Sequence, residues 1–595
     1  MKISITNLVS GEELDYSLPL LIGKVFNSNG VINVNVTNTT LQKTLSWPVR
    51  NSQFKALVQL TPGLNTIIIS CLGISEEITL TYKISKCKYF VRPVYIRCKD
   101  DPGCFQAPDS QDNSPQSAQR RITLGAQLIQ TFTAEKINEQ ALGRVTFQLE
   151  TDQNHRPICY IFTTSLTLNE AHSMSGNELW THFAREFMSS NLPNKEYCKW
   201  YAFMSFTRYS VKEGFIPKTH AEILQHTKGH TALGGGGLAL FGTGNLHTWA
   251  ESLDEVLPRL TDCQKINKAQ LMDDSAYRQY YWANYSTGLG ASLHELGHTF
   301  DLGHTPSGIM ARGFDDLYRV FTVQPHTQGK KYSIYNHSNT DKTVQVKQQK
   351  PIATNKRIPR VRHNSAPTTV DVFIQIEPAF QRTKPECRQL MIVRNYDGTE
   401  TRKLLSSSQY TTRNNRIRSE TRPLNDSCCE EHNNHSVITE SQSQPVSVQN
   451  SPVRVLPAKL PNTSETLPIS IKSKPKQQCP DGGAYWFRSS AVLLRYHKWF
   501  NCYEDCPKIP RPMEINKNMV TSLYGLRIVE LRSIPEGVVI RHWEFSGPAS
   551  AKYFRIDGEE AKNKSQNALM VSVIAEDERG NVIKKKVQTA ELTAE

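Results

Sequence analysis

The sequence predicts a multidomain α+β protein, in which a central α/β domain lies between two β-rich modules and is followed by a long disordered insert. Three observations support this fold class. The chain has 595 residues, which is long for one domain. Apolar and polar residues alternate near both ends, whereas helical and strand-like segments follow one another in the middle. A polar, basic stretch then separates the middle from the C-terminal part.

Residues 1–85 have the texture of short strands. Apolar and polar side chains alternate in 31–36, and a second apolar run, 56–60, leads into the turn Thr61-Pro62-Gly63. Short strands joined by Pro-Gly turns are typical of a β-sandwich. We therefore predict a β-sandwich-like module over 1–85.

Residues 86–325 are predicted to form the central α/β domain. A helical pattern covers 119–142 and a strand-like run covers 144–149. A helix is expected near 178–188 and a strand near 200–209. Such alternation is typical of a sheet covered by helices.

The most informative motif is HELGHTFDLGH, which begins at His294. Residues four apart lie on one face of a helix, so His294 and His298 can direct their rings at one metal ion. Glu295 projects beside them, and a turn after the helix can return His304 as a third ligand. Three protein ligands leave a fourth position for water, which is typical of a catalytic zinc site.

Other third ligands are less consistent with the sequence. One class of zinc peptidase takes a glutamate from a later helix, but no glutamate occurs between Glu295 and Glu377. Another class uses a downstream aspartate, for which Asp315 or Asp316 would be available. His304 is the simpler choice. The expected metal ligands are therefore His294, His298 and His304, and the expected cofactor is Zn²⁺.

The pattern HExxHxxxxxH, followed by Ser307-Gly308-Ile309-Met310, resembles the metzincin clan of zinc peptidases. The resemblance implies a metzincin-like domain in which Met310 lies on a tight turn and forms an apolar floor beneath the metal. The clan normally has glycine where this chain has Asp301. Aspartate is among the few other residues enriched in the left-handed conformation required there.

A closer resemblance is to a eukaryotic family of zinc metallopeptidases, whose fungal members include proteins with a C-terminal jacalin-like domain. It rests on HELGHTFDLGHTPSGIMARGFDD, GGGGLALFGTGNLHTW and YWFRSSAVLLRYHKWF, and it covers 86–325 and 478–515. No jacalin-like part is evident in this sequence.

These motifs predict a zinc metallopeptidase that acts on a peptide or protein. Zinc would activate water, and Glu295 would be the general base and the only catalytic side chain assigned. Two alternatives remain open. One is a non-catalytic zinc-containing scaffold that binds peptides or nucleic acid, which the intact Glu295 disfavours. The other is a hydrolase of a non-peptide amide or ester.

A substrate-binding strand is expected upstream of the motif. The segment GGGGLALFGTG places a short apolar strand between glycines, which allow another backbone to approach closely. We predict an edge strand that pairs with an extended peptide. Its residues are Leu238, Ala239, Leu240 and Phe241. The alternative is an ordinary glycine-rich loop.

Residues 326–477 form a basic, low-complexity insert. They contain 24 Lys or Arg against 12 Asp or Glu, an excess of 12, while the whole chain carries +14. We predict that this insert is mostly disordered, with one strand near 370–376. A basic insert can bind nucleic acid, although a solvated linker is favoured because aromatic residues are few.

The rest of the chain returns to regular patterns. Residues 478–515 are expected to contribute an aromatic-rich helix that completes the central domain. Residues 516–595 are β-like, with apolar runs at 526–531 and 570–574, and are predicted to form a C-terminal β module.

Composition suggests a cytoplasmic protein, with the nucleus not excluded. The chain has no run of 18 apolar residues and no apolar signal near Met1, so no membrane association is expected. Its 13 cysteines form no compact framework and are expected to be reduced thiols. The sequence does not indicate an oligomeric state.

Overall fold

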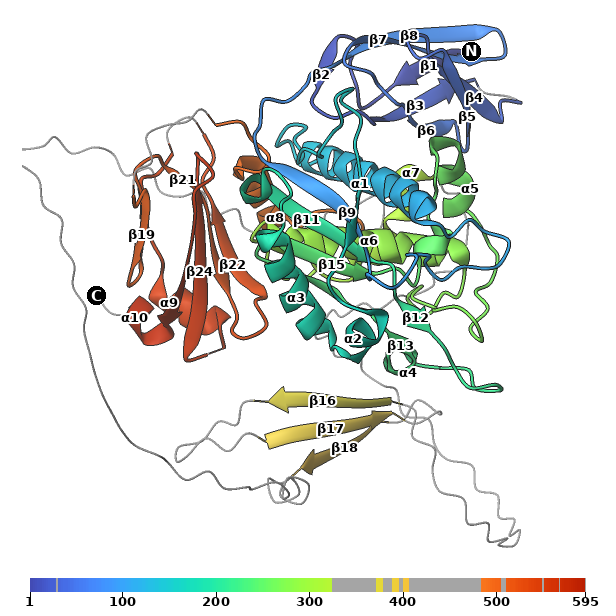
Figure 1. The fold of residues 1–595 in the computed structure, drawn as a ribbon. Coiled ribbons are helices and arrows are strands. Elements are labelled where there is room, and N and C mark those ends of the chain that lie inside the picture. The colour runs from blue at the N-terminus through green and yellow to red at the C-terminus, as the bar shows by residue number, and fades with distance from the viewer. Residues whose placement is uncertain are drawn as a thin grey trace, which may run out of the picture. The chain divides into compact units, whose positions relative to one another are not determined.

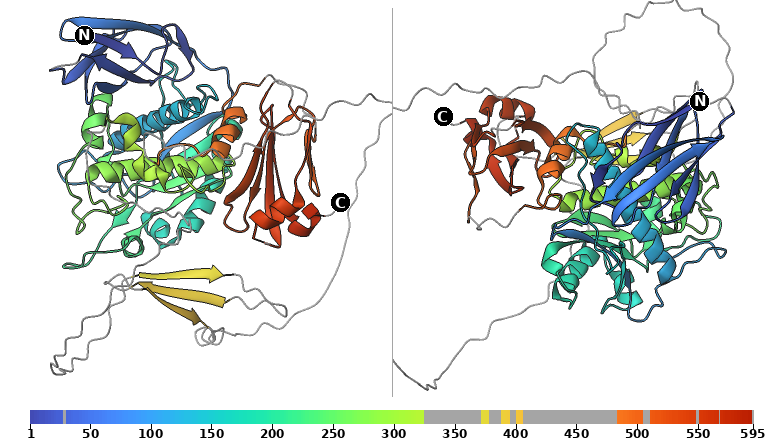
Figure 2. Two further views of the ribbon diagram at one scale, coloured as in Figure 1. Left: turned by 180° about the vertical axis from the view of Figure 1, so that it is seen from behind. Right: turned by 90° about the horizontal axis from the view of Figure 1, so that it is seen from above.

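The computed structural model describes residues 1–27, 30–323, 371–377, 388–394, 400–405, 483–503, 510–547, 550–566 and 568–593. The chain divides into two compact units, one made of Met1–Lys331 with Ser464–Glu595 and the other of 332–463. The first unit is a mixed α/β assembly with several sheets (Figures 1 and 2). No helix in the described ranges has the length and apolar character needed to cross a bilayer.

The N-terminal strands form two sheets. One has the order β1-β3-β6, and the other has the order β2-β8-β7-β4-β5. The strands are β1 (Lys2–Ile5), β2 (Glu12–Leu14), β3 (Leu20–Phe26), β4 (Asn33–Asn38), β5 (Lys43–Pro48), β6 (Gln53–Leu57), β7 (Gly63–Cys71) and β8 (Ile74–Tyr82). Alternate residues of these strands are buried, as in β4, where Val34 and Val36 are inside and Asn33 and Asn35 are exposed.

Asp15, beside β2, makes the stability of this region depend on pH. Burial raises the pKa of Asp15 from 3.8 to about 6, against opposing hydrogen bonds that include one from Gln148 Nε2. Because the folded chain holds this proton more tightly than the unfolded chain, stability falls as the pH rises from about 4 to about 6. We expect the free energy of unfolding of Asp15→Asn at pH 7 to exceed that of the wild type by an amount on the order of 1–3 kcal/mol. The variant should therefore melt at a higher temperature.

Thermal unfolding of both proteins at about pH 3.5 and about pH 7 checks this expectation. The advantage of Asp15→Asn should vanish at the lower pH, where the carboxyl group is protonated in both states. Asp109→Asn, at an exposed position, is the control. Equal melting temperatures of Asp15→Asn and wild type at pH 7 would contradict the argument.

A five-stranded sheet forms the centre of the first unit, in the order β10-β9-β11-β15-β14. Its strands are β9 (Phe90–Arg97), β10 (Tyr160–Thr163), β11 (Cys198–Met204), β14 (Ala232–Gly235) and β15 (Leu238–Gly242). The first four strands in this order are parallel, and β14 pairs antiparallel with β15. β14 therefore forms one edge of the sheet.

Helices cover both faces of this sheet (Figure 1). Tyr201 and Phe203 belong to the hydrophobic cluster that includes α1 (Pro115–Asn138) and α6 (Tyr281–Thr299). Alternate residues such as Ala202 belong to a second cluster with α2 (Leu168–Ser173) and α3 (Gly176–Ser189). The remaining short elements are β12 (Arg208–Tyr209), α4 (His220–Gln225), β13 (Thr227–Lys228), α5 (Val256–Leu260) and α7 (Tyr318–Phe321).

Local sequence features explain where the expected elements differ from the observed ones. The helix expected over 119–142 begins earlier, because Ser114 accepts the backbone N–H of Ser117 and caps the helix. The strand expected over 144–149 is reduced to one bridge, between Val91 and Leu149. Arg144 at its start is instead held by the carboxylates of Glu12 and Glu135.

The C-terminal part contains α8 (Arg488–Tyr496) and two further sheets. The four-stranded sheet has the order β22-β21-β24-β25, with β21 (Leu526–Arg532), β22 (Val539–Glu544), β24 (Met570–Asp577) and β25 (Val582–Gln588). The three-stranded sheet has the order β19-β20-β23, with β19 (Met513–Asn516), β20 (Met519–Ser522) and β23 (Tyr553–Arg555). Two short helices, α9 (Gly558–Lys564) and α10 (Thr589–Thr593), accompany them.

Most of the insert predicted at 326–477 lies outside the described residues, so its predicted disorder and nucleic-acid binding remain predictions. The described parts form an antiparallel sheet in the order β16-β17-β18. Its strands are β16 (Asp371–Glu377), β17 (Arg388–Arg394) and β18 (Glu400–Leu405). β16 covers most of the strand expected near 370–376.

Candidate metal centre

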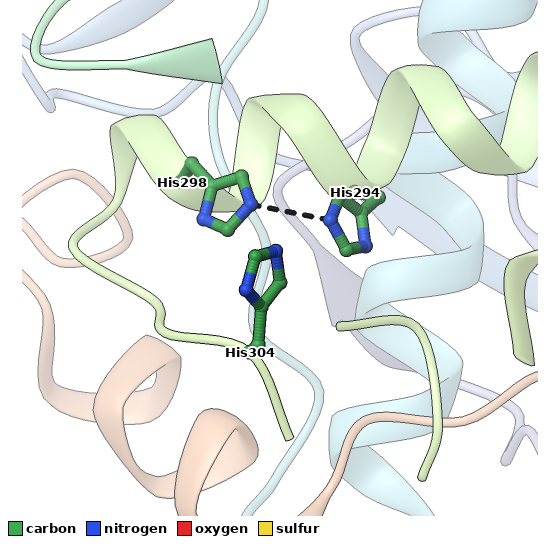
Figure 3. A group of neighbouring side chains, drawn as sticks. All are labelled: His294, His298 and His304. Atoms are coloured by element: carbon green, nitrogen blue, oxygen red, sulfur yellow. Dashed lines mark hydrogen bonds between the residues drawn. The ribbon is translucent and has the colours of Figure 1, made fainter. Parts of the chain in front are cut away.

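Helix α6 ends directly after its two histidines. Its last residue is Thr299, and Asp301 adopts a left-handed conformation with φ of 62°. This turns the chain back, so that His304 faces His294 and His298 (Figure 3). The ring centroid of His304 lies 5.4 Å from that of His294 and 4.8 Å from that of His298. The turn thus brings the three predicted ligands together.

Each imidazole is oriented by a backbone carbonyl. The Nδ1–H groups of His294, His298 and His304 donate to Ile309 O at 2.7 Å, Leu302 O at 3.0 Å and Glu536 O at 3.1 Å. A carbonyl can only accept, so Nδ1 carries the proton and Nε2 remains a free ligand atom. The Nε2 atoms of His294 and His298 lie 3.1 Å apart.

These features fit a divalent metal. The candidate ligand atoms of the three histidines lie within 4.8 Å of one another. Burial lowers the pKa of His294 to about 3 and that of His298 to about 4, so both rings are neutral at physiological pH. Neutral imidazoles with a hydrogen-bonded Nδ1 are typical ligands of zinc. The donor set therefore fits the predicted cofactor.

Glu295 lines a cavity of about 400 Å³ together with two of the three histidines, His294 and His304. The cavity wall includes His294, Glu295, His304, Met310, Arg312 and Phe314. Glu295 Oε2 accepts the backbone N–H of Gly234 at 2.7 Å. Burial raises the pKa of Glu295 to about 7, and the bond from Gly234 opposes this shift.

Met310 lies on a tight turn and lines the same cavity as Glu295. Gly308 has φ of 85°, and Ala311 N donates to Gly308 O at 3.0 Å, which closes the turn. The Met310 side chain is fully buried. A methyl group added at Gly297, on the ligand helix, would lie 2.7 Å from Met310 Sδ. Met310 thus packs directly against the turn of α6 between the two ligands.

The prediction that 238–241 form an edge strand is wrong. Leu238, Ala239, Leu240 and Phe241 belong to β15, which lies between β11 and β14 and is buried on both faces. Four consecutive apolar residues without alternation are typical of such an interior strand. The edge strand is β14, whose last two residues, Gly234 and Gly235, begin the glycine run that precedes β15. It is β14 that touches Glu295, through Gly234.

The alternative aspartate ligands are engaged elsewhere. Asp315 Oδ2 pairs with Arg312 at 3.1 Å, and Asp316 Oδ1 lies 3.5 Å from Arg278. Among the described residues, only the three histidines form a group of ligand atoms suited to a metal.

The carbonyl groups that orient the histidines could not be identified from the sequence. Ile309 O, Leu302 O and Glu536 O come from backbone positions that any residue type could occupy, so no side-chain pattern marks them. Glu536 is moreover 232 residues away from His304 along the chain.

Comparison with known proteins connects this geometry to a family. Residues 2–374 match a family model named Metallopep, which is described as "Putative peptidase family". A Schizosaccharomyces pombe protein named "Putative zinc metalloproteinase" is 30% identical over 301 residues, which is 47% of this chain and 46% of that protein. A Saccharomyces cerevisiae protein with the same description is 28% identical over 354 residues, which is 54% of this chain and 49% of that protein.

The matched regions thus span about half the length of these curated relatives. Among solved structures, OgpA from Akkermansia muciniphila aligns over 84% of this chain and 92% of its own, with 10% identity and a TM-score of 0.35. The family model, by contrast, covers more than half of the chain. The chain therefore belongs to the "Putative peptidase family", which confirms the predicted resemblance to a eukaryotic family of zinc metallopeptidases.

Proposed function

We propose that this protein is a zinc-dependent peptidase that hydrolyses peptide bonds with water, and that its catalytic domain is metzincin-like. The observation that carries the proposal is a group of three imidazoles with free Nε2 atoms beside the half-buried carboxylate of Glu295, which lines one cavity together with His294 and His304. A purely structural zinc site has no use for such a carboxylate. The left-handed Asp301 and the buried Met310 support the metzincin-like arrangement.

Each residue would have a distinct role. His294, His298 and His304 would hold the zinc, which when bound supplies a Lewis acid that activates water and polarises the scissile carbonyl. Glu295 would accept a proton from the attacking water and donate it to the leaving nitrogen. Its Oε2 is held by the Gly234 N–H, so Oε1 is the oxygen available for the proton.

The position of β14 favours an extended peptide as the substrate. β14 is at the edge of the central sheet, and the Gly234 N–H donates to Glu295 rather than to its neighbour β15. An extended peptide that pairs with this edge would place its main chain beside Glu295. Main-chain pairing tolerates many side chains, so specificity would come from the cavity that Arg312 and Phe314 help to line.

We propose the same division of the chain as its sequence predicts. Residues 86–325 with 478–515 would form the catalytic domain, and 1–85 and 516–595 would be β modules on either side of it. Hydrogen bonds link the two parts of the catalytic domain, among them Ile309 N to Tyr485 O at 2.9 Å, Tyr485 Oη to Ser307 Oγ at 2.7 Å, and Gln140 Nε2 to Trp486 O at 2.5 Å.

Digestion of a proteome-derived peptide library by the zinc-loaded full chain tests the proposal. Glu295→Ala, loaded with zinc in the same way, is the control. We expect new peptide termini from the wild type alone, because Glu295 supplies the proton transfers; general acid–base groups typically contribute about 10²–10⁴-fold to a rate. The sequences around the new termini would define the cleavage preference. Equal cleavage by both proteins, or cleavage by neither with zinc bound, would contradict the proposal.

A further inference from the structure

The third histidine is held by the C-terminal sheet. β22 is an edge strand of that sheet, and His304 forms a parallel bridge with Val538 at its start. The Val539 N–H donates to His304 O at 2.8 Å, and the His304 Nδ1–H donates to Glu536 O at 3.1 Å. The segment 536–539 thus binds both the main chain and the ring of this ligand.

A buried arginine fixes the turn that leads to His304. The Arg532 side chain is 4% exposed, and its Nη2 donates to Asp301 O at 2.8 Å. Its Nε donates to Glu530 Oε2 at 2.7 Å, and the Glu530 side chain is 1% exposed. Arg532 thus connects a buried carboxylate of the C-terminal sheet to the left-handed residue that ends the active-site helix.

The loop that carries His304 is in direct contact with the C-terminal segment that contains Arg532 and Gly537. A methyl group added at Gly303 would lie 2.6 Å from Gly537 O and 2.8 Å from Arg532 Cδ. Gly303 therefore permits the close approach that the hydrogen bonds of Arg532 and Val539 require.

The three ligands need different kinds of support. His294 and His298 are fixed by the backbone of α6, on which they are one turn apart. His304 lies on a loop and is the most exposed of the three. Its position therefore depends on what the loop is bonded to, and the contacts described above come from residues 532–539.

We propose that the C-terminal sheet is part of the metal site, in which Arg532 and the segment 536–539 position His304 for metal binding. This inference rests on the proposed function, because it presumes that the three histidines hold zinc. It assigns a role to residues beyond 374, where the match to the family model ends. Groups that orient metal ligands typically contribute about 10–100-fold to metal affinity.

Zinc affinity of the full chain, measured by competition with a chromophoric chelator, tests the inference. In Arg532→Lys the single ammonium group can still pair with buried Glu530 but cannot also reach Asp301 O. We expect zinc to bind about tenfold or more weakly to it than to the wild type. The absorption spectrum of the cobalt-substituted protein should also change, because the geometry of the third ligand changes.

Arg527→Lys is the matched control. Arg527 lies on the same strand, β21, and also bridges a carboxylate and a carbonyl, with Nη2 donating to Glu578 Oε2 at 3.1 Å and Nη1 to Gly547 O at 3.0 Å. These partners are not in the metal site. A loss of affinity in Arg532→Lys but not in Arg527→Lys therefore separates positioning of the ligand from general damage to the sheet.

Val539→Pro provides a second, independent variant. It removes the N–H that donates to His304 O while leaving Glu530 and Arg532 paired, and proline is tolerated at the first residue of an edge strand. It decides the question if Arg532→Lys proves unstable in a thermal melt of the metal-free protein. Wild-type zinc affinity and an unchanged cobalt spectrum in Val539→Pro, and in Arg532→Lys where it folds, would overturn the inference. A wild type that binds no zinc would instead overturn the proposed function.

Discussion

Replacing Gly234 by alanine is expected to abolish nearly all peptide hydrolysis, whereas replacing Gly237 by alanine is expected to have little effect. A methyl group at Gly234 would overlap the main-chain carbonyl of Glu295. No side-chain rotation can relieve this overlap, because both partners belong to the backbone. Either β14 or α6 must move, and the bond from the Gly234 N–H to Glu295 Oε2 would be lost or distorted.

The effect on rate follows from the position of Glu295. A displacement of about 1 Å in a catalytic group can cost about 10²-fold in rate, and β14 is also the proposed substrate-binding edge. We therefore expect kcat/KM of Gly234→Ala, on a peptide selected from the library, to fall by about 10²-fold or more. At Gly237 an added methyl group meets no atom within 4 Å. Gly237→Ala is therefore the matched control. It adds the same methyl group two residues after the end of β14, where the group overlaps no other atom.

Two results would contradict this argument. One is a Gly234→Ala protein with activity within a few-fold of the wild type. The other is an equal loss of activity in both variants, which would indicate that the glycine run needs flexibility rather than close contact. Zinc affinity and the melting temperature of each variant show whether the metal site and the fold have survived.

The sequence was most informative where the geometry is local. His294 and His298 come together because an α-helix repeats every 3.6 residues. His304 follows only six residues after His298, so a single turn decides its position. Asp301 in the left-handed conformation supplies that turn, as the residue type suggested. The cofactor, and the grouping of the three histidines, could therefore be predicted without knowledge of the tertiary structure.

The order of the strands could not be predicted in the same way. The glycine run was expected near the histidines, and Gly234 does contact Glu295, but the apolar residues 238–241 were assigned to the edge that β14 occupies. When two neighbouring segments both form strands, their order in the sequence does not say which of them lies at the edge. Every residue of 238–241 is buried, whereas no residue of β14 is, and the unbroken apolar run is the one sign of this in the sequence.

Long-range support for the site could not be predicted at all. Arg532 and Glu536 lie more than 200 residues beyond the motif, on the other side of the insert. Arg532 binds the backbone carbonyl of Asp301, and Glu536 binds the His304 ring through its own backbone carbonyl. Any residue type could supply either carbonyl, so no pair of residue types marks these contacts in the sequence. The C-terminal strands themselves were recognisable from the apolar runs at 526–531 and 570–574, which correspond to β21 and β24. Their relation to His304 depends on packing alone.

Zinc is expected to raise the melting temperature of the wild type and to leave that of His298→Ala unchanged. The Nε2 atoms of His294 and His298 lie 3.1 Å apart, and the Nδ1–H group of each ring donates to a carbonyl. Burial keeps the pKa of both rings low, so near neutral pH both Nε2 atoms can offer lone pairs to a cation. Zinc held by these atoms and by His304 would bind the folded chain in preference to the unfolded one, because folding brings the three rings together.

The size of the shift follows from mass action. A ligand present at about 1,000 times its dissociation constant stabilises the folded state by about 4 kcal/mol. His298→Ala leaves two imidazoles, one of them on a loop, so zinc should bind too weakly to stabilise the fold at the same concentration. Melting curves recorded with zinc and with excess chelator measure both proteins.

His182→Ala is the control for the loss of a helical histidine. His182 lies on α3, and its ring is 3.3 Å from the carboxylate of Glu186, four residues later on the same face of the helix. His182→Ala therefore also removes one histidine from an i, i+4 pair on a helix, but away from the three histidines. We expect the zinc-dependent shift to persist in this variant. If the shift persisted in His298→Ala as well, zinc would be stabilising the chain from another site, and the three histidines would have to be assigned a different role. If it disappeared only in His298→Ala, the stabilisation would come from the site that also holds Glu295, as the proposed peptidase function requires.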